Sequence, residues 1–153
     1  MDQQTNHLVL PFPECALVAF VPNYELKTSD SRNVLPSEWT YKEAVAASAI
    51  ANVAIAALAK GDLRVAGKAI EADRFHERYR QQLVAEFPQV KEVAHQHDAY
   101  ATYLSGAGPT IMTLLPVEHS EAFAKDLESK DLNGQVFSLK IDTTGVKVEN
   151  SGS

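Results

Sequence analysis

The chain has 153 residues, of which 45% are hydrophobic and 22% are charged, so we expect residues 1–153 to form one soluble domain with a real core. Its formal net charge of -6 argues against a nucleic-acid-binding protein, because such proteins bind phosphates through clustered lysine and arginine. The single cysteine, Cys15, cannot form an internal disulfide and suits a reducing cytosol.

The first part of the chain predicts a strand followed by a polar loop. Residues 8–13 form an extended apolar entry, and the apolar run at 16–21 has the length of a strand. A strand that arrives with nothing before it suggests that the chain begins partway through a larger protein. Serine, threonine and aspartate then dominate residues 26–36 and favour turns. We expect a structured loop from which Arg32 projects, although an ordinary surface loop with a solvated arginine fits the same residues.

An alanine-rich helix is predicted next. Thr40 and Glu43 have the spacing of a capping box, in which each side chain accepts a hydrogen bond from the other residue's backbone. Gly61 follows Lys60 as a C-terminal cap, which ends the helix there. Residues 44–59 are mainly alanine, so a buried core helix of a soluble protein explains them better than a membrane span does.

Asp62 predicts the N-cap of a second helix, because its side chain can accept a backbone hydrogen bond. The apolar residues of this helix recur at helical spacing: Leu63, Ala66, Ala69 and Ile70. Apolar residues then recur every fourth position, and Pro88 ends the stripe: Phe75, Tyr79, Leu83 and Phe87. The charged run at 73–80 is typical of a solvent-facing helix surface, but it could equally form an anion site.

The order of the remaining elements predicts the fold. We expect a helix at 90–97, strands at 100–104 and 110–115, an amphipathic helix at 118–129, a strand at 137–141 with one wet face, and a turn at Gly145 into 146–148. This order favours an α+β fold of ferredoxin-like type, a two-layer sandwich with helices on one face of a mostly antiparallel sheet. His95 and His97 point to different sides of a helix, so no metal site is expected.

A glycine turn joins the two central strands. Its sequence at 105–110 is Ser-Gly-Ala-Gly-Pro-Thr, in which Gly106 and Gly108 allow positive φ and close approach of another segment or a ligand. By itself, such a segment is often only a tight turn. The turn resembles, however, the C-terminal signature of the GHMP kinases, the small-molecule kinases named for galactose, homoserine, mevalonate and phosphomevalonate.

Two arginine segments narrow the resemblance to the homoserine kinase family. Residues 28–32 with Leu35-Pro36 look like its Thr-x-x-x-Arg segment, and residues 77–80 look like its Glu-Pro-x-Arg segment, with Arg78 in place of the proline. Residues 142–146 are similar to its closing turn. The resemblance covers nearly the whole chain and implies the fold of a GHMP kinase C-terminal domain.

The resemblance also implies a substrate site. Arg32 and Arg80 would hold the carboxylate of L-homoserine, with Thr28 assisting, because guanidinium groups form paired hydrogen bonds with carboxylates. Gly106 and Gly108 would let backbone amides approach the substrate or the loop beside the phosphates. The implied reaction transfers the γ-phosphoryl group of ATP to the homoserine hydroxyl, in cytoplasmic threonine biosynthesis, and no residue of this chain is assigned a catalytic role.

The family's N-terminal half, with its phosphate loop, has no counterpart in the sequence. ATP and Mg²⁺ would bind mainly to that missing domain, which would be the chief partner of this chain. We therefore expect the isolated chain to be inactive, and its exposed interdomain surface favours a homo-oligomer. The alternatives are another GHMP small-molecule kinase and a stand-alone amino-acid-binding module of ferredoxin-like shape.

Overall fold

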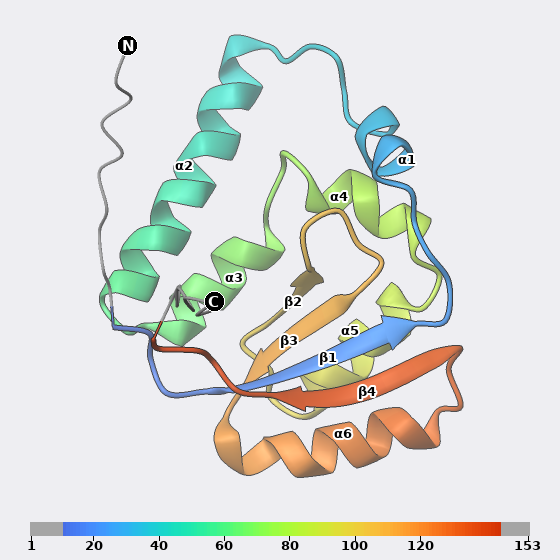
Figure 1. Ribbon diagram of the computed structural model, residues 1–153. Helices are drawn as coiled ribbons and strands as arrows, with labels where there is room; N and C mark the ends of the chain where they lie inside the picture. Colours follow the sequence, from blue (N-terminus) through green and yellow to red (C-terminus); the bar gives the residue numbers. More distant parts are fainter. Residues whose placement is uncertain (1–10, 145–153) are drawn as a thin grey trace, which may run out of the picture.

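The computed structural model describes residues 11–144. In this part of the chain, a sheet of four strands forms the centre: β1 (Ala16–Pro22), β2 (Ala101–Leu104), β3 (Ile111–Leu115) and β4 (Gly134–Leu139). The strands lie in the order β2-β3-β1-β4, and every neighbouring pair is antiparallel (Figure 1). This order confirms the ferredoxin-like prediction. The predicted turn at Gly145 and the segment 146–148 lie outside the described residues.

The main core lies between one face of the sheet and two helices, α5 (Phe87–Gln96) and α6 (Ser120–Ser129). Side chains alternate along β1, so Val18 and Phe20 point to the same face and are almost fully buried. Phe123 of α6 packs into the same cluster. The amphipathic pattern of α6 therefore predicted its buried side correctly, although a short 3-10 helix, η2 (Val117–His119), precedes it.

Two further helices follow each other beside the sheet: α2 (Tyr41–Ala59) and α3 (Leu63–Glu71). The predicted caps are confirmed, because Thr40 and Glu43 form the capping box and Asp62 accepts a hydrogen bond from the Val65 amide. Burial of α2 was predicted wrongly. Its most apolar 18-residue window is only 17% buried, and Ile55 is 61% exposed.

By length and composition, α2 is also long and apolar enough to cross a membrane. One such helix is only weak evidence for a membrane span, because helices of soluble proteins pass the same test. Figure 1 shows it standing away from the sheet, with α3 between it and the strands. Close packing is found instead on α3, whose Gly67 lies directly against the backbone of Tyr100. The small side chains of α2 thus leave one flank of the helix without a partner among the described residues.

The segment before α2 and the segment after α3 differ from prediction. The polar connector contains a short helix, α1 (Thr28–Asn33), because the buried side chain of Ser31 holds it to the glycine turn. The stripe from residue 75 to residue 87 is not one helix. It contains α4 (Glu77–Arg80) and the 3-10 helix η1 (Gln81–Leu83). Pro88 lies in the first turn of α5, where a missing N–H group costs nothing.

The last strand was predicted to have one exposed face, but exposed side chains lie on both of its faces: Ser138 as expected, and Phe137 and Leu139 as well. Phe137 and Leu139 pair with Ala19 and Leu17 of β1, and this places them on the face opposite α5 and α6. Their side chains are 44% and 43% exposed. Ile141 lies beyond the end of β4. The apolar alternation therefore marks a sheet face that the described residues leave largely uncovered.

Candidate functional site

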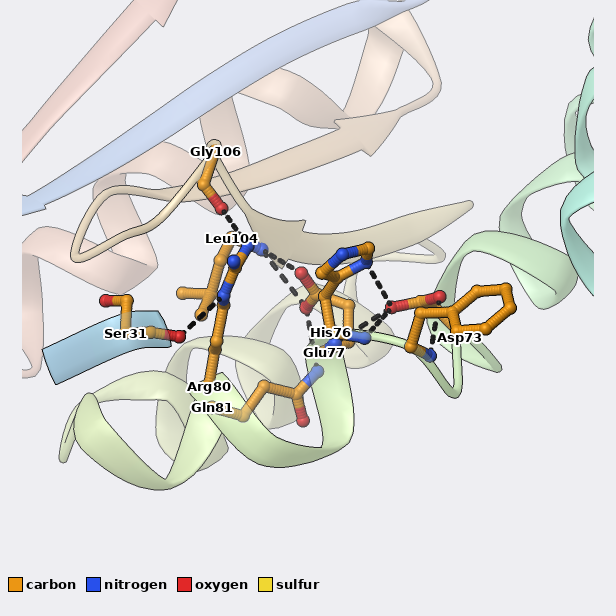
Figure 2. Close-up of polar contacts among 9 residues, drawn as sticks. Ser31, Asp73, His76, Glu77, Arg80, Gln81, Leu104 and Gly106 are labelled. Carbon is orange, nitrogen blue, oxygen red and sulfur yellow. Dashed lines mark hydrogen bonds and ion pairs between the residues drawn. The ribbon is translucent and has the colours of Figure 1, made fainter. Parts of the chain in front are cut away.

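Arg80 connects three segments that are far apart in the sequence. Its Nε donates a hydrogen bond to the carbonyl oxygen of Ser31 at 3.1 Å, and its Nη1 donates to the carbonyl oxygen of Gly106 at 3.2 Å (Figure 2). Ser31 belongs to α1, Arg80 to α4 and Gly106 to the turn between β2 and β3. The guanidinium carries five N–H donors, so three remain for a ligand.

The glycine turn has the backbone that its sequence requires. Gly106 has φ of 59° and Gly108 has φ of 87°, both in the region that favours glycine. The Ser105 amide donates to the Thr110 carbonyl at 2.8 Å, and the Gly108 amide donates to the Ser105 carbonyl at 3.0 Å. Consequently the amide of Gly108 bonds within the turn, and the contribution of Gly106 to the site is a carbonyl oxygen.

Ser31 fixes α1 to this turn from the other side. Its side chain is fully buried, and its hydroxyl donates to the Ala107 carbonyl at 2.8 Å. Thr28 and Arg32 lie on the same short helix and are exposed. Within residues 11–144, no hydrogen bond or ion pair involves the guanidinium of Arg32. The structure thus brings Arg80 and the turn into contact and carries Thr28 and Arg32 to the same region through α1.

A buried carboxylate lies beside Arg80. Glu77 is 8% exposed, and both of its oxygens accept the Leu104 amide at 3.2 Å. The Gln81 side chain donates to Oε2 at 2.9 Å. Burial raises the pKa of Glu77 above its ordinary value, and the bonds from Gln81 and Leu104 and the charge of Arg80 offset this only in part.

Asp73 sets the start of α4. Its carboxylate accepts backbone hydrogen bonds from Phe75, His76 and Glu77 at 3.1, 2.8 and 2.8 Å (Figure 2). Burial raises the pKa of Asp73, but these three donors outweigh burial and leave the pKa below its ordinary value. This cap explains why the chain turns at residue 73 instead of continuing α3.

Sequence reasoning did not identify Ser31, Glu77 or Asp73 as site residues. Ser31 and Glu77 both lie inside the two segments that carry the family resemblance, so their presence there was the available signal. His95 and His97 contact different carboxylates, those of Glu71 and Asp126. These two histidines therefore do not share a ligand.

An open groove of about 510 Å³ lies next to the turn. Residues 21–26 line it together with Pro109 and Thr110. The Tyr24 hydroxyl donates to Glu86 Oε2 at 2.7 Å. Burial and the neighbouring carboxylate raise the pKa of Tyr24 to about 12, so this hydroxyl is a neutral donor at any ordinary pH.

Comparison with known proteins gives consistent matches. The family model described as "GHMP kinases C terminal" matches residues 54–132. The chain is 58% identical over 149 residues to a homoserine kinase of Streptococcus thermophilus, covering 97% of this chain and 52% of the relative. It is 62% identical over 138 residues to a homoserine kinase of Streptococcus gordonii, covering 90% of this chain and 48% of the relative.

A solved structure agrees with these sequence matches. The homoserine kinase from Cytophaga hutchinsonii superposes with a TM-score of 0.77 at 26% identity, covering 90% of this chain and 45% of that one. The chain therefore spans about half the length of the curated relatives that it matches.

Proposed function

The chain belongs to the GHMP kinases as a C-terminal domain of that family, and we propose that it is the substrate-binding half of a homoserine kinase. The whole enzyme would transfer the γ-phosphoryl group of ATP to the side-chain hydroxyl of L-homoserine, in the cytoplasm. The observation that carries the proposal is the contact of Arg80 with both α1 and the glycine turn. It supports a site where a small carboxylate can meet a guanidinium with free donors.

In this proposal, the residues of the chain bind and orient the amino acid. Arg80 holds the substrate carboxylate, and Arg32 and Thr28 approach it from α1. Such positioning is a large part of what phosphoryl transfer needs, since the reacting hydroxyl must lie in line with the phosphate.

We place the nucleotide and its metal ion outside the described residues. Within residues 11–144, no group of three histidine, cysteine, aspartate or glutamate side chains could hold a metal ion. The amides of Ser105 and Gly108, which could otherwise face a phosphate, bond within the turn. When bound, ATP supplies the phosphoryl group, and we assign ATP and Mg²⁺ to the part of the relatives that this chain does not span.

The exposed side of α2 is a candidate surface for that remaining half. Tyr41, Val45 and Ile55 share one face of the helix at helical spacing, and each is at least half exposed. Tyr41 and Val45 also line an open groove of about 400 Å³ along α2. Exposed apolar surface of this kind usually marks an interaction site.

Reconstitution tests the proposal. The chain alone should not phosphorylate L-homoserine, and co-expression with the complementary half of the Streptococcus thermophilus enzyme should give ATP-dependent activity. Arg80→Ala should lower kcat/KM for L-homoserine roughly ten- to hundredfold, the loss expected for charge-assisted hydrogen bonds. Arg78→Ala is the matched control, because Arg78 lies on the same helix and covers the Tyr79 ring instead.

Three results would contradict the proposal. They are turnover by the chain alone, a reconstituted enzyme that prefers mevalonate over L-homoserine, and equal effects of the Arg80 and Arg78 substitutions.

A further inference from the structure

Two carboxylates close the outer edge of β2. Among the described residues, β2 ends the sheet on one side, so its outward amides have no neighbouring strand. The Thr102 amide donates to Glu71 Oε1 at 2.8 Å, and the Leu104 amide donates to Glu77. Exposed strand edges need such acceptors, because an unpaired backbone N–H is costly and invites pairing with another chain.

The two glutamates differ in what else they contact. Glu71 also meets Lys91 at 3.0 Å and the His95 ring at 3.1 Å, which are both on α5 and away from the glycine turn. Glu77 meets Gln81 within its own helical segment and lies beside Arg80. Only the second of these carboxylates lies next to the proposed substrate site.

Contacts around Glu77 form a closed ring. Its carboxylate holds Leu104, and the next residue, Ser105, begins the glycine turn. The turn offers the Gly106 carbonyl to Arg80, and Arg80 stands three residues after Glu77 on α4. Covalent bonds and hydrogen bonds thus link these five residues in a circle, and Figure 2 labels all of them except Ser105.

We propose that Glu77 is a positioning residue that sets the guanidinium of Arg80 against the glycine turn. Its carboxylate fixes the distance between α4 and the end of β2, and this distance decides where the Gly106 and Ser31 carbonyls receive Arg80. The importance of this alignment for substrate rests on the proposed function, in which the remaining donors of Arg80 bind a carboxylate. Geometry on the ångström scale matters there, because paired hydrogen bonds are directional.

A purely structural role would make Glu77 equivalent to Glu71. Both carboxylates cap an amide of the same strand, two residues apart, so removing either should loosen the edge. Only removal of Glu77 should disturb Arg80. Glu71→Ala is therefore the matched control for Glu77→Ala.

The substitutions Glu77→Ala, Glu77→Asp and Glu77→Gln separate the effect of side-chain length from the effect of charge. Glu77→Asp keeps the charge but shortens the side chain by about 1.5 Å, so it no longer reaches Leu104. In Glu77→Gln, the amide oxygen can accept the Leu104 amide while its NH₂ group donates to a turned Gln81 side chain. Glu77→Gln should thus rescue what Glu77→Ala and Glu77→Asp lose.

The experiment is nuclear magnetic resonance on the 153-residue chain. The Arg80 Nε–H signal, assigned by its loss in Arg80→Lys, reports the hydrogen bond to Ser31. Its exchange with water should be roughly tenfold faster in Glu77→Ala and Glu77→Asp, as expected when a charged hydrogen bond loses alignment. It should stay within about twofold of the wild type in Glu77→Gln and Glu71→Ala.

An unchanged Arg80 signal in folded Glu77→Ala would overturn the inference, and so would an equal change in Glu71→Ala. If Glu77→Ala does not fold, Glu77→Asp decides by the same criterion. A parallel titration with L-homoserine keeps the two proposals apart. Absence of binding to the wild type, with the expected Arg80 changes, would reject the proposed function and leave the positioning role standing.

Discussion

Replacement of Gly67 by alanine tests the closest contact between helix and sheet. An added Cβ would lie 1.8 Å from the Tyr100 carbonyl oxygen and 2.5 Å from its carbonyl carbon, whereas real Cβ atoms essentially never come within 3.0 Å of such neighbours. Tyr100 cannot move freely, because its amide donates to the Leu114 carbonyl at 2.8 Å. The helix α3 and the start of β2 must therefore separate by roughly 1 Å or more.

Two opposing effects decide the magnitude. Alanine is the better helix former and stabilises a helix interior by about 1 kcal/mol relative to glycine. Overpacking typically costs about 1–3 kcal/mol, and a collision with fixed backbone belongs at or above the upper end of that range. We expect a net loss of about 2 kcal/mol in the free energy of unfolding, equivalent to a fall of about 4–8 °C in Tm for a domain of this size.

Urea unfolding followed by circular dichroism measures this loss, and thermal unfolding gives the shift in Tm. Lys68→Ala is the control, because it places alanine at the next position of the same helix, where the side chain is exposed. Gly67→Ala should be clearly less stable than this control. If Gly67→Ala equals or exceeds the wild type in stability, α3 does not pack backbone to backbone against β2.

Three further predictions concern charge and surface. Asp73→Ala should lower the free energy of unfolding by about 1 kcal/mol through loss of the cap. Because the folded pKa of Asp73 is lowered, the unfolded chain binds more protons in acid. The stabilisation by Asp73 is therefore present above about pH 4 and lost as the pH falls through the folded pKa. Urea unfolding across pH should show the difference in stability between the wild type and Asp73→Ala shrinking in acid, and a difference that stays constant would contradict this. The phenol of Tyr24 should titrate at about 12, and Glu86→Gln should lower that pKa while leaving it above 10, since burial is the larger cause; an absorbance titration that finds wild-type Tyr24 near 10 would contradict this. Ile55→Ser should change the free energy of unfolding by less than about 0.5 kcal/mol yet weaken reconstitution with the complementary half. Unchanged reconstitution would show that this face of α2 is not the contact.

Local chemistry explains which parts of the fold could be predicted. The capping box at Thr40 and the cap at Asp62 involve residues three apart, so their pattern is visible in the sequence. The continuous apolar run of β1 and the two glycines of the turn are equally local. Each of these features depends on its neighbours in the chain, and each formed as predicted.

Long-range contacts explain the errors. The helix α1 depends on Ser31, whose hydroxyl reaches a carbonyl 76 residues away. The break before α4 depends on three backbone amides that donate to Asp73. The apolar pattern from residue 75 to residue 87 predicts one continuous helix and gives no sign of this break. The exposure of α2 and β4 could not be predicted either. An apolar face has the same sequence pattern whether or not another part of the protein covers it.

The edge of β2 connects the sheet with the candidate site. A strand at the end of a sheet needs acceptors for its outward amides, and this chain provides them as glutamates on α3 and α4. Because the acceptor for Leu104 is on the same helix as Arg80, the requirement that closes the sheet also fixes the guanidinium. A change in how the edge is closed at Leu104 should therefore alter recognition of the proposed substrate, whereas a change at Thr102 should alter stability alone.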